Sequence, residues 1–244
     1  MASSEREGAA GAGQEEEEEE RSAAPEDGDG CEDLQPHPSS LLSRRTLDEL
    51  GQLQDADPDN YKLHSSWAFW FERSPKGGSA SDFFANLRQI YVVKTIKAFW
   101  CVFNNLSPVD QLRERESYHL MRDTERRPVW EDELNAHGGM WSFRVKKEDT
   151  AAVWQEVLLA AIGEQFLHNM DTGDDVCGVS VRIRGFDHNV IQIWNMDSEQ
   201  HSKSSVIQRV KELIPSIEIN EFYQCMCPLL PSLSILLSFP AVIT

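Results

Sequence analysis

The chain has 244 residues, which is enough for one domain of ordinary size. Residues 1–60 hold 18 acidic residues and 4 arginines, whereas residues 61–244 hold 23 acidic and 19 basic groups, so the net charge of −18 belongs mainly to the N-terminal segment. The overall acidity therefore does not exclude a nucleic-acid ligand for the rest of the chain.

The cysteines favour a reduced, intracellular protein. Five cysteines are an odd number, and we find no signal peptide before them. Cys225 and Cys227 lack the spacing of a zinc knuckle, and no second Cys/His pair lies near them. We therefore expect free thiols, no metal site and no cofactor, in a monomer that resides in the cytoplasm, with the nucleus as a second compartment.

Residues 1–60 are predicted to form a disordered acidic arm, since the six-glutamate run 15–20 and its Ala, Gly and Ser neighbours offer almost nothing to bury. Thr46 and Glu49 have the spacing of a helix capping box. Leucines follow at helical intervals at Leu47, Leu50 and Leu53. Because isolated helices of this length are marginal, we expect a transient helix and not a docked one.

Residues 61–224 alternate strand-like and helix-like patterns and are predicted to be the folded domain. Apolar runs rich in β-branched and aromatic residues predict strands. The clearest are Trp67–Phe71, Leu87–Val93, Val176–Ile183 and Val190–Trp194, and shorter candidates are Ser117–Arg122, Met140–Val145 and Ser216–Phe222.

Three amphipathic helices are predicted at Val153–Ile162, Val206–Ile214 and, more weakly, Thr95–Asn105. Asp149 is the cap candidate of the first, and Pro215 ends the second. About seven or eight strands with three long helices predict an α+β domain, a curved and mostly antiparallel sheet with the helices on its convex face. The concave face would then be open to a ligand.

Motifs of catalysis are absent from the sequence. It contains no glycine-rich phosphate loop, no His-Glu-x-x-His and no Gly-x-Ser-x-Gly turn. The histidines of the domain share no ligand spacing, and each is expected at the surface: His64, His119, His137, His168, His188 and His201. We therefore expect a binding protein and not an enzyme.

Seven tryptophans lie between positions 67 and 194. Large aromatic side chains usually belong to the core, which is our interpretation of Trp67, Trp70, Trp141 and Trp154. Trp130 differs, because it stands in a polar, loop-like setting directly before Glu131-Asp132-Glu133.

An exposed indole beside a carboxylate suits the recognition of guanine. The base stacks on the indole, and the carboxylate accepts hydrogen bonds from its Watson–Crick edge. A guanine methylated on its imidazole nitrogen is positively charged, which adds a cation–π contribution of about 0.5–2 kcal/mol per contact.

Several short stretches of residues 61–223 match a known family in sequence and in order. They are Trp67–Phe71, Ala85–Arg88, Phe99-Trp100, Trp130–Glu133, Gly138–Trp141, Ile162–Glu164, Asp174–Gly178 and Ile191–Trp194. With them the chain resembles the eukaryotic translation initiation factor 4E family of mRNA cap-binding proteins. Tyr118–Arg122 and Glu125–Pro128 look most like the third class of that family.

The resemblance implies a site for the methylated guanine of the cap. Trp130 would stack on the base, Glu131 would bind its edge, and Trp194 would lie against the methyl group. The family's second stacking tryptophan falls on Phe83, which either offers a weaker π-face or packs beneath its loop.

The resemblance also implies that Arg184 binds the cap phosphates. Met140 stands where the best-known members carry a phosphate-assisting arginine, and Gly185–Val190 lacks the family's phosphate-binding lysine. Fewer cations predict weaker cap binding with a flatter salt dependence.

On the opposite, helix-covered face the resemblance implies a groove for a partner helix, supplied by a scaffold initiation factor of the 4G type or by a 4E-binding protein. The matching positions are Tyr61, Leu63, Ile96, Trp100, Glu156, Leu159 and Gly163, with Gln155 where a leucine is usual. Ile96 fits a buried contact between helices equally well, whereas Trp100 favours the groove.

Residues 225–244 form a divergent apolar tail, interpreted as an alternative terminus and not as a membrane segment, because Pro231 and Pro240 interrupt it. The expected function is that of a cap-binding translation initiation factor that recruits a scaffold partner. The alternative is a regulatory interaction protein with weak cap affinity that sequesters scaffold partners and represses translation.

Overall fold

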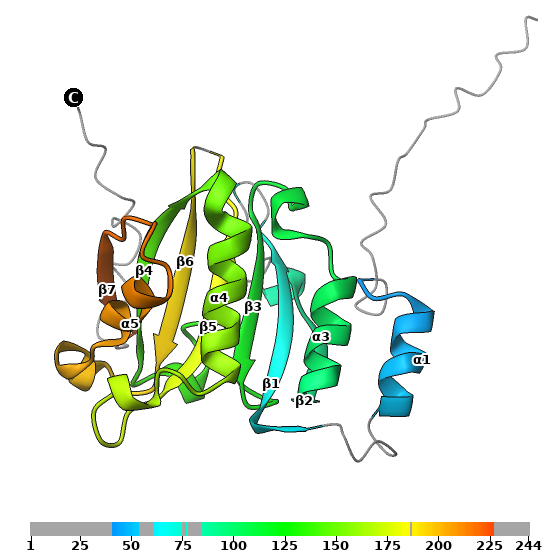
Figure 1. The fold of residues 1–244 in the computed structure, drawn as a ribbon, viewed down its shortest axis with the longest axis horizontal. Coiled ribbons are helices and arrows are strands. Elements are labelled where there is room, and N and C mark those ends of the chain that lie inside the picture. Colours follow the sequence, from blue (N-terminus) through cyan, green and yellow to red (C-terminus); the bar gives the residue numbers. More distant parts are fainter. Residues whose placement is uncertain (1–40, 54–60, 75–76, 78–83, 186, 227–244) are drawn as a thin grey trace, which may run out of the picture. The chain divides into compact units, whose positions relative to one another are not determined.

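A computed structural model describes residues 41–53, 61–74, 77, 84–185 and 187–226, which contain one seven-stranded antiparallel sheet (Figure 1). The strands are β1 Lys62–Arg73, β2 Leu87–Thr95, β3 Glu116–Arg122, β4 Gly139–Lys146, β5 Val176–Arg182, β6 His188–Asn195 and β7 Glu221–Cys225. Their order across the sheet is β2-β1-β3-β5-β6-β4-β7. The prediction of an α+β domain with a curved antiparallel sheet is confirmed.

The last strand begins later than its sequence pattern predicts. Ile217 and Ile219 supply the alternating pattern, but both pack against the core from a loop. Only from Glu221 onward does the chain pair with β4, opposite Phe143. The expected strand Ser216–Phe222 is therefore shifted toward the C-terminus.

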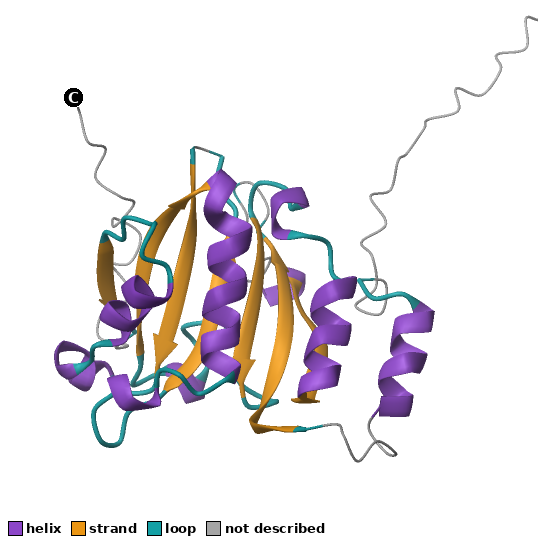
Figure 2. Cartoon of the chain, in the orientation of Figure 1, coloured by secondary structure: helices purple, strands orange, loops and turns teal. Residues whose placement is uncertain are grey.

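Three helices pack against one face of the sheet, as Figures 1 and 2 show: α3 Ile96–Asn105, α4 Thr150–Ile162 and α5 Val206–Leu213. Thr95 caps α3 by accepting a hydrogen bond from Ala98 N at 3.2 Å. Asp149 precedes α4 as expected, but its side chain makes no capping hydrogen bond. At eight residues, α5 is shorter than predicted, because Pro215 disfavours helical geometry at the residue before it.

A further helix, α1 Arg44–Leu53, corrects the expectation of a transient helix. Its cap is Ser43, whose Oγ accepts a hydrogen bond from Thr46 N at 3.1 Å. Thr46 is therefore not the cap; it is buried within the helix, and its hydroxyl donates to Asn105 Oδ1 of α3 at 3.2 Å. Leu50 is buried in the same core as α3. Tertiary burial thus stabilises a helix too short to persist alone.

Several predictions about the termini are left untested. The arm at residues 1–40 and 54–60 and the apolar tail at 227–244 lie outside the described residues. Within the described part of the chain, no helix is long and apolar enough to cross a membrane. No cluster of three metal-binding side chains is found there either, and Cys101 and Cys177 are free thiols.

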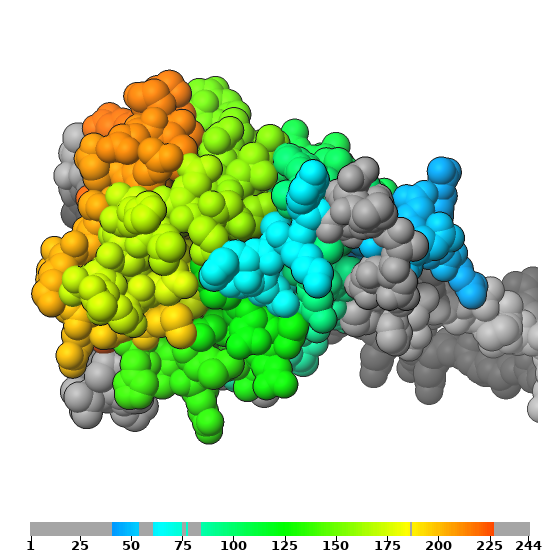
Figure 3. All heavy atoms as spheres, turned by 60° about the horizontal axis from the view of Figure 1, so that its bottom comes forward, coloured from blue at the N-terminus to red at the C-terminus, as the bar shows by residue number. Residues whose placement is uncertain are grey.

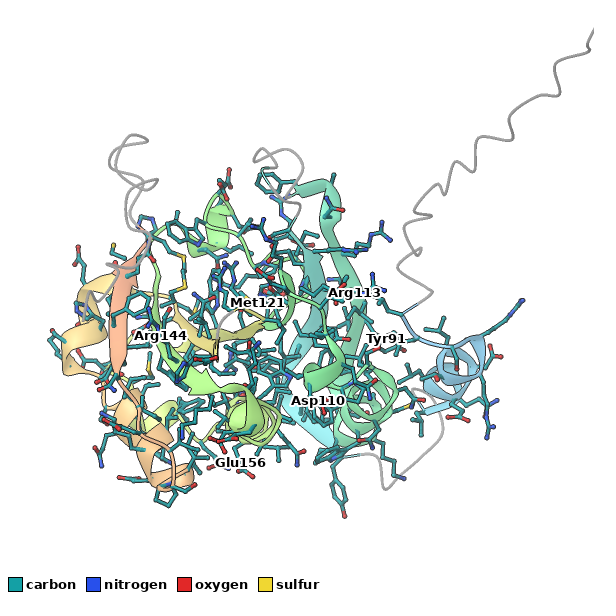
Figure 4. All side chains as sticks on the ribbon, turned by 90° about the horizontal axis from the view of Figure 1, so that it is seen from above. Tyr91, Asp110, Arg113, Met121, Arg144 and Glu156 are labelled. Atoms are coloured by element: carbon teal, nitrogen blue, oxygen red, sulfur yellow. The ribbon has the colours of Figure 1, made fainter. Side chains whose placement is uncertain are left out.

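Side chains of β1 alternate between two environments. Trp67 and Phe69 join the main core beneath the helices, whereas Trp70 points to the opposite face of the sheet. Figure 4 shows the two sides, with Glu156 of α4 on one and Met121 on the other. The second face carries an apolar group that we call the concave cluster: Ala68, Trp70, Met121, Met140, Cys177, Trp194 and Met226. The predicted burial of Trp67, Trp70, Trp141 and Trp154 is confirmed.

The same face buries a charged group. His119, expected at the surface, is completely buried, with its Nε2 3.4 Å from Glu72 Oε2. Arg182 Nη2 lies 3.6 Å from the same oxygen. Burial opposes ionisation of Glu72, but the close contact with His119 and the charge of Arg182 lower its pKa to about 2. Burial lowers the pKa of His119, so the ring is neutral beside an ionised carboxylate.

The pKa shifts predict that acid destabilises the fold through this group. The Glu72 pKa falls from 4.5 to about 2 on folding, so its stabilising contribution is complete above about pH 4.5 and is lost as the pH falls toward 2. His119 acts in the same direction, because the unfolded chain binds its proton first as the pH falls below about 6.5. Glu72→Gln should therefore lower stability at neutral pH and flatten its decline in acid, measured by urea unfolding at several pH values.

The matched control is Glu148→Gln, which neutralises an exposed glutamate. Its unfolding free energy should follow the unmodified protein at every pH. If the unfolding free energy of Glu72→Gln fell in acid as steeply as that of the unmodified protein, the stabilising role assigned to the ionised Glu72 would be contradicted.

Candidate functional site

The loop between β3 and β4 holds Trp130 and Glu131 on a rigid support. Asn135 is buried within it and donates from Nδ2 to the carbonyl oxygens of Arg127 and Val129, each at 2.8 Å. Asn135 Oδ1 in turn accepts a hydrogen bond from Arg126 Nη1 at 2.9 Å. The loop therefore has its own buried polar centre, and in Figure 3 it lies in the green part of the molecule that projects toward the lower edge.

Asp132 fixes the backbone directly after the two candidate residues. Its carboxylate accepts from Arg127 Nε and from Leu134 N, both at 3.0 Å. Trp130 is half-buried and packs against the concave cluster, whereas Glu131 is exposed. The sequence places these two residues side by side, and the hydrogen bonds of Asp132 and Asn135 hold them in position without using Glu131 itself.

Two glycines join this loop to the sheet. A Cβ on Gly138 would lie 2.2 Å from Asn195 O, and a Cβ on Gly139 would lie 2.0 Å from the Tyr223 hydroxyl. Any side chain here would push β4 away from β6 and β7. The Gly138-Gly139 pair is therefore explained by close packing at the base of the loop.

Trp194 lies on the concave face in β6, opposite Met140 of β4 and Gly178 of β5. Its exposure is 0%, and its indole Nε1 donates to Ser180 Oγ at 2.9 Å. Contact between this indole and a ligand therefore requires a neighbouring side chain to move aside.

Arg184 stands just beyond the end of β5 with an exposed side chain, and its backbone N donates to Asn189 Oδ1 at 3.0 Å. Its pKa is lowered first by desolvation and then by the charges of Arg182 and Arg115, while Glu72 and Glu114 act in the opposite direction. Arg115 N donates a hydrogen bond to Ile183 O at 3.1 Å, which places this arginine beside the end of β5 and forms an arginine corner with Arg182 and Arg184. Sequence reasoning missed Arg182 and Arg115. Strand parity could have indicated Arg182, which lies on the same face of β5 as Ser180, whereas Arg115 comes from a distant segment.

Phe83 lies outside the described residues, so its predicted role as a second stacking group is untested. Its neighbour Phe84 is described and is 37% exposed. Met140 is buried in the concave cluster, where its Sδ accepts a hydrogen bond from Gln192 Nε2 at 2.9 Å. It therefore supplies apolar surface and no positive charge.

The partner positions gather on the helix-covered face. Tyr61 is 70% exposed, and its carbonyl oxygen accepts a hydrogen bond from Ile96 N at 2.9 Å, which joins the start of β1 to the start of α3. Ile96 is 42% exposed, so the alternative of a buried contact between helices is wrong for this residue. Leu63 is half-buried against the main core.

The remaining partner positions lie on α4 and α3. Glu156 and Leu159 are half-buried on α4, and Gly163 ends that helix with its N donating to Leu159 O at 2.9 Å. A Cβ on Gly163 would lie 2.8 Å from the same oxygen, so a larger residue would disturb the helix end.

Trp100 is half-buried on α3, packed edge-on against Phe99 and Phe103. It also lines a hollow that α1 borders with Glu49, Gln52 and Leu53. The contribution of α1 to this hollow was not predicted, because the sequence pattern indicated a transient helix that does not dock on the domain.

The chain matches the family model described as eukaryotic initiation factor 4E over residues 62–225. Eukaryotic translation initiation factor 4E-1 of Arabidopsis thaliana is 32% identical over 158 residues, which are 64% of this chain and 65% of the relative. The chain thus matches slightly less than two thirds of that relative's length. The corresponding Zea mays protein is 30% identical over 172 residues, 68% of this chain and 76% of the relative.

Solved structures have the same fold. Caenorhabditis elegans eIF4E-3, in complex with the 4E-binding protein Mextli and a cap analog, has a TM-score of 0.60 at 24% identity and covers 68% of this chain and 92% of its own. Ascaris suum eIF4E-3 in complex with an m2,2,7G cap has a TM-score of 0.59 at 26% identity, covering 68% and 91%. On the extent of the family match, the chain belongs to the eukaryotic initiation factor 4E family.

Proposed function

We propose that this protein binds the 7-methylguanosine cap of mRNA and acts as a translation initiation factor. The observation that carries the proposal is Trp130-Glu131 on a hydrogen-bonded loop at the rim of the aromatic concave cluster. Family membership supports the same function and agrees with a binding protein and not an enzyme. The cap complex of the Ascaris relative supports the choice of ligand.

The base would stack on Trp130, with Glu131 accepting hydrogen bonds from the guanine edge and Trp194 meeting the methyl group. Because Glu131 is exposed and Trp130 is half-buried, the carboxylate and the indole are both accessible from the loop side. Phe83 or the exposed Phe84 would face the other side of the base. The positive charge of the methylated base favours both the indole and the carboxylate.

The cap phosphates would bind Arg184, assisted by Arg182 and Arg115. Desolvation and, after it, the charges of the two neighbouring arginines lower the pKa of Arg184, and a bound anion would offset both effects. Arg182 is partly engaged by Glu72, so it supplies less free charge than an unpaired arginine.

On the other face, an amphipathic helix of a 4G-type scaffold or a 4E-binding protein would bind between α3 and α4. The exposed Ile96 and the half-buried Trp100 and Leu159 offer the apolar surface, and Glu156 offers a charge at its edge. The Mextli complex of the nematode relative shares this fold. We propose a monomer in the cytoplasm.

The second candidate is a regulatory protein that keeps the partner groove but has weak cap affinity. The complete burial of Trp194 favours it, since cap binding must first open the concave cluster. Retention on immobilised cap, compared with partner capture, separates the two candidates.

Glu131→Gln should weaken binding of a methylated cap analogue about tenfold, because a charge-assisted acceptor is lost, and should affect the unmethylated analogue less. Tryptophan fluorescence titration with both analogues measures this. Glu133→Gln, which removes another exposed glutamate of the same loop, is the control and should bind as the unmodified protein does. Equal binding of both analogues by the unmodified protein would refute the proposal.

Arg184→Ala should weaken cap binding and reduce the slope of log affinity against log salt by about 1, as expected for one lost phosphate contact. Titrations at several salt concentrations measure the slope. Arg209→Ala, on α5 and paired with Glu212 and Gln165, should leave the slope unchanged. If the slope for Arg184→Ala were unaltered, Arg184 would not be a phosphate-binding residue.

Trp100→Ala should abolish capture of a 4G-type scaffold fragment and spare retention on cap resin, because it removes apolar surface from the helix face only. Trp130→Ala should lose retention on cap resin and keep capture of the scaffold fragment. Both variants are assayed by pull-down and by circular dichroism. Loss of both activities in Trp100→Ala would indicate a folding defect, and retention of both would exclude the groove.

A further inference from the structure

A chain of polar contacts crosses four strands beneath the concave face and ends at Trp194. The Trp194 indole Nε1 lies 2.9 Å from Ser180 Oγ, which lies 2.7 Å from His119 Nδ1. His119 Nε2 is 3.4 Å from Glu72 Oε2. The four residues come from β6, β5, β3 and β1 and are all completely or almost completely buried. Antiparallel pairing places His119 directly opposite Ser180, and Glu72 lies on the same face of β1 as Trp70, the residue opposite His119.

The protons of this chain have one favoured arrangement. The indole N–H can only donate, so Ser180 Oγ accepts from Trp194. If His119 carried its proton on Nδ1, its bare Nε2 lone pair would face the Glu72 carboxylate, which is repulsive. With the proton on Nε2, the ring points an N–H at Glu72 and accepts the Ser180 hydroxyl proton on Nδ1. All donors then point from Trp194 toward the carboxylate.

Around Glu72 lie two further groups. Arg182 Nη2 is 3.6 Å from its Oε2, and the Ser74 hydroxyl donates to its Oε1. The carboxylate is therefore anchored independently of His119. The Trp194–Ser180 and Ser180–His119 hydrogen bonds are aligned in one direction, and the Glu72 charge lies 3.4 Å beyond the far side of the His119 ring. Aligned hydrogen bonds polarise each other in a medium of low dielectric constant, so the negative charge is felt at the indole N–H.

We propose that Ser180 and His119 are positioning residues for Trp194, which fix the plane of its indole and, through the charge of Glu72, make its ring a better contact for a positively charged base. The inference rests on the proposed cap-binding function. Packing already restricts this fully buried indole, and the hydrogen bond to Ser180 adds a directional constraint on its ring plane. The polar chain also connects the electron density of the ring to the charge of Glu72. Cation–π attraction depends on both, because the cation must lie over the ring face.

The test measures the ratio of the dissociation constants for unmethylated and methylated cap analogues. Ser180→Ala should lower this ratio about fivefold, as expected for the loss of one hydrogen bond that favours the methylated base. Ser180→Thr keeps the hydroxyl and should restore most of the ratio. Glu72→Gln keeps the chain but removes its charge, and it should lower the ratio by a smaller factor.

Ser142→Ala is the matched control. Ser142 is a buried serine of the same face on β4, and it hydrogen-bonds Gln192 and not Trp194. Its ratio should equal that of the unmodified protein. The indole N–H resonance of Trp194, assigned with Trp194→Phe, should shift in Ser180→Ala and stay in Ser142→Ala.

The outcomes separate this inference from the proposed function. If the unmodified protein binds both analogues equally, both proposals fail. If it discriminates and Ser180→Ala keeps the full ratio, or loses affinity for both analogues equally, the positioning role alone is refuted. Should Ser180→Ala fail to fold, His119→Gln decides the question, since its amide cannot span from Ser180 to Glu72. An unchanged ratio in that variant would also refute the role.

Discussion

The two-residue alternation of an antiparallel sheet is the constraint on which the rest of this structure depends. It sends Phe69 to the helices and Trp70 to the opposite face within one strand, so a single sheet builds a core and a second aromatic surface. The helices bury the first face. The second is closed by its own side chains, since Trp194 and Met140 are almost entirely buried. A ligand on this face would therefore compete with self-packing, which, together with the small number of cations, accounts for the modest affinity that we expect.

The two proposed recognition elements use different kinds of support. Trp130 and Glu131 stand on a loop whose rigidity comes from the buried Asn135 and Asp132 and not from regular secondary structure. Trp194 stands on a central strand and is oriented by a side-chain hydrogen bond. The arginine corner at the end of β5 connects to the buried group through Glu72, which faces both Arg182 and His119. The proposed sites for base and phosphate would thus share one carboxylate.

The partner face is shaped by a helix that lies outside the family match. α1 begins at Arg44, before the matched residues 62–225, and packs beside α3 with Leu50 fully buried. It adds Glu49, Gln52 and Leu53 to the surroundings of Trp100. The surface proposed for a partner helix therefore combines residues of the family-matched domain with residues of the N-terminal helix α1.

Periodicity and composition alone determined most strand and helix segments, the burial of four tryptophans and the polar loop setting of Trp130-Glu131, because these depend on near neighbours in the chain. The resemblance to the family indicated which residues to assign to the candidate site and what role to expect of each. Only the tertiary structure decided what depends on distant contacts. It buried His119 beside Glu72, docked α1 on α3, moved the start of β7 to Glu221 and brought Arg115 to Arg184. The sequence pattern around His119 is that of an ordinary polar position; its partners on β1 and β5 lie 47 and 61 residues away, and only sheet pairing brings them together.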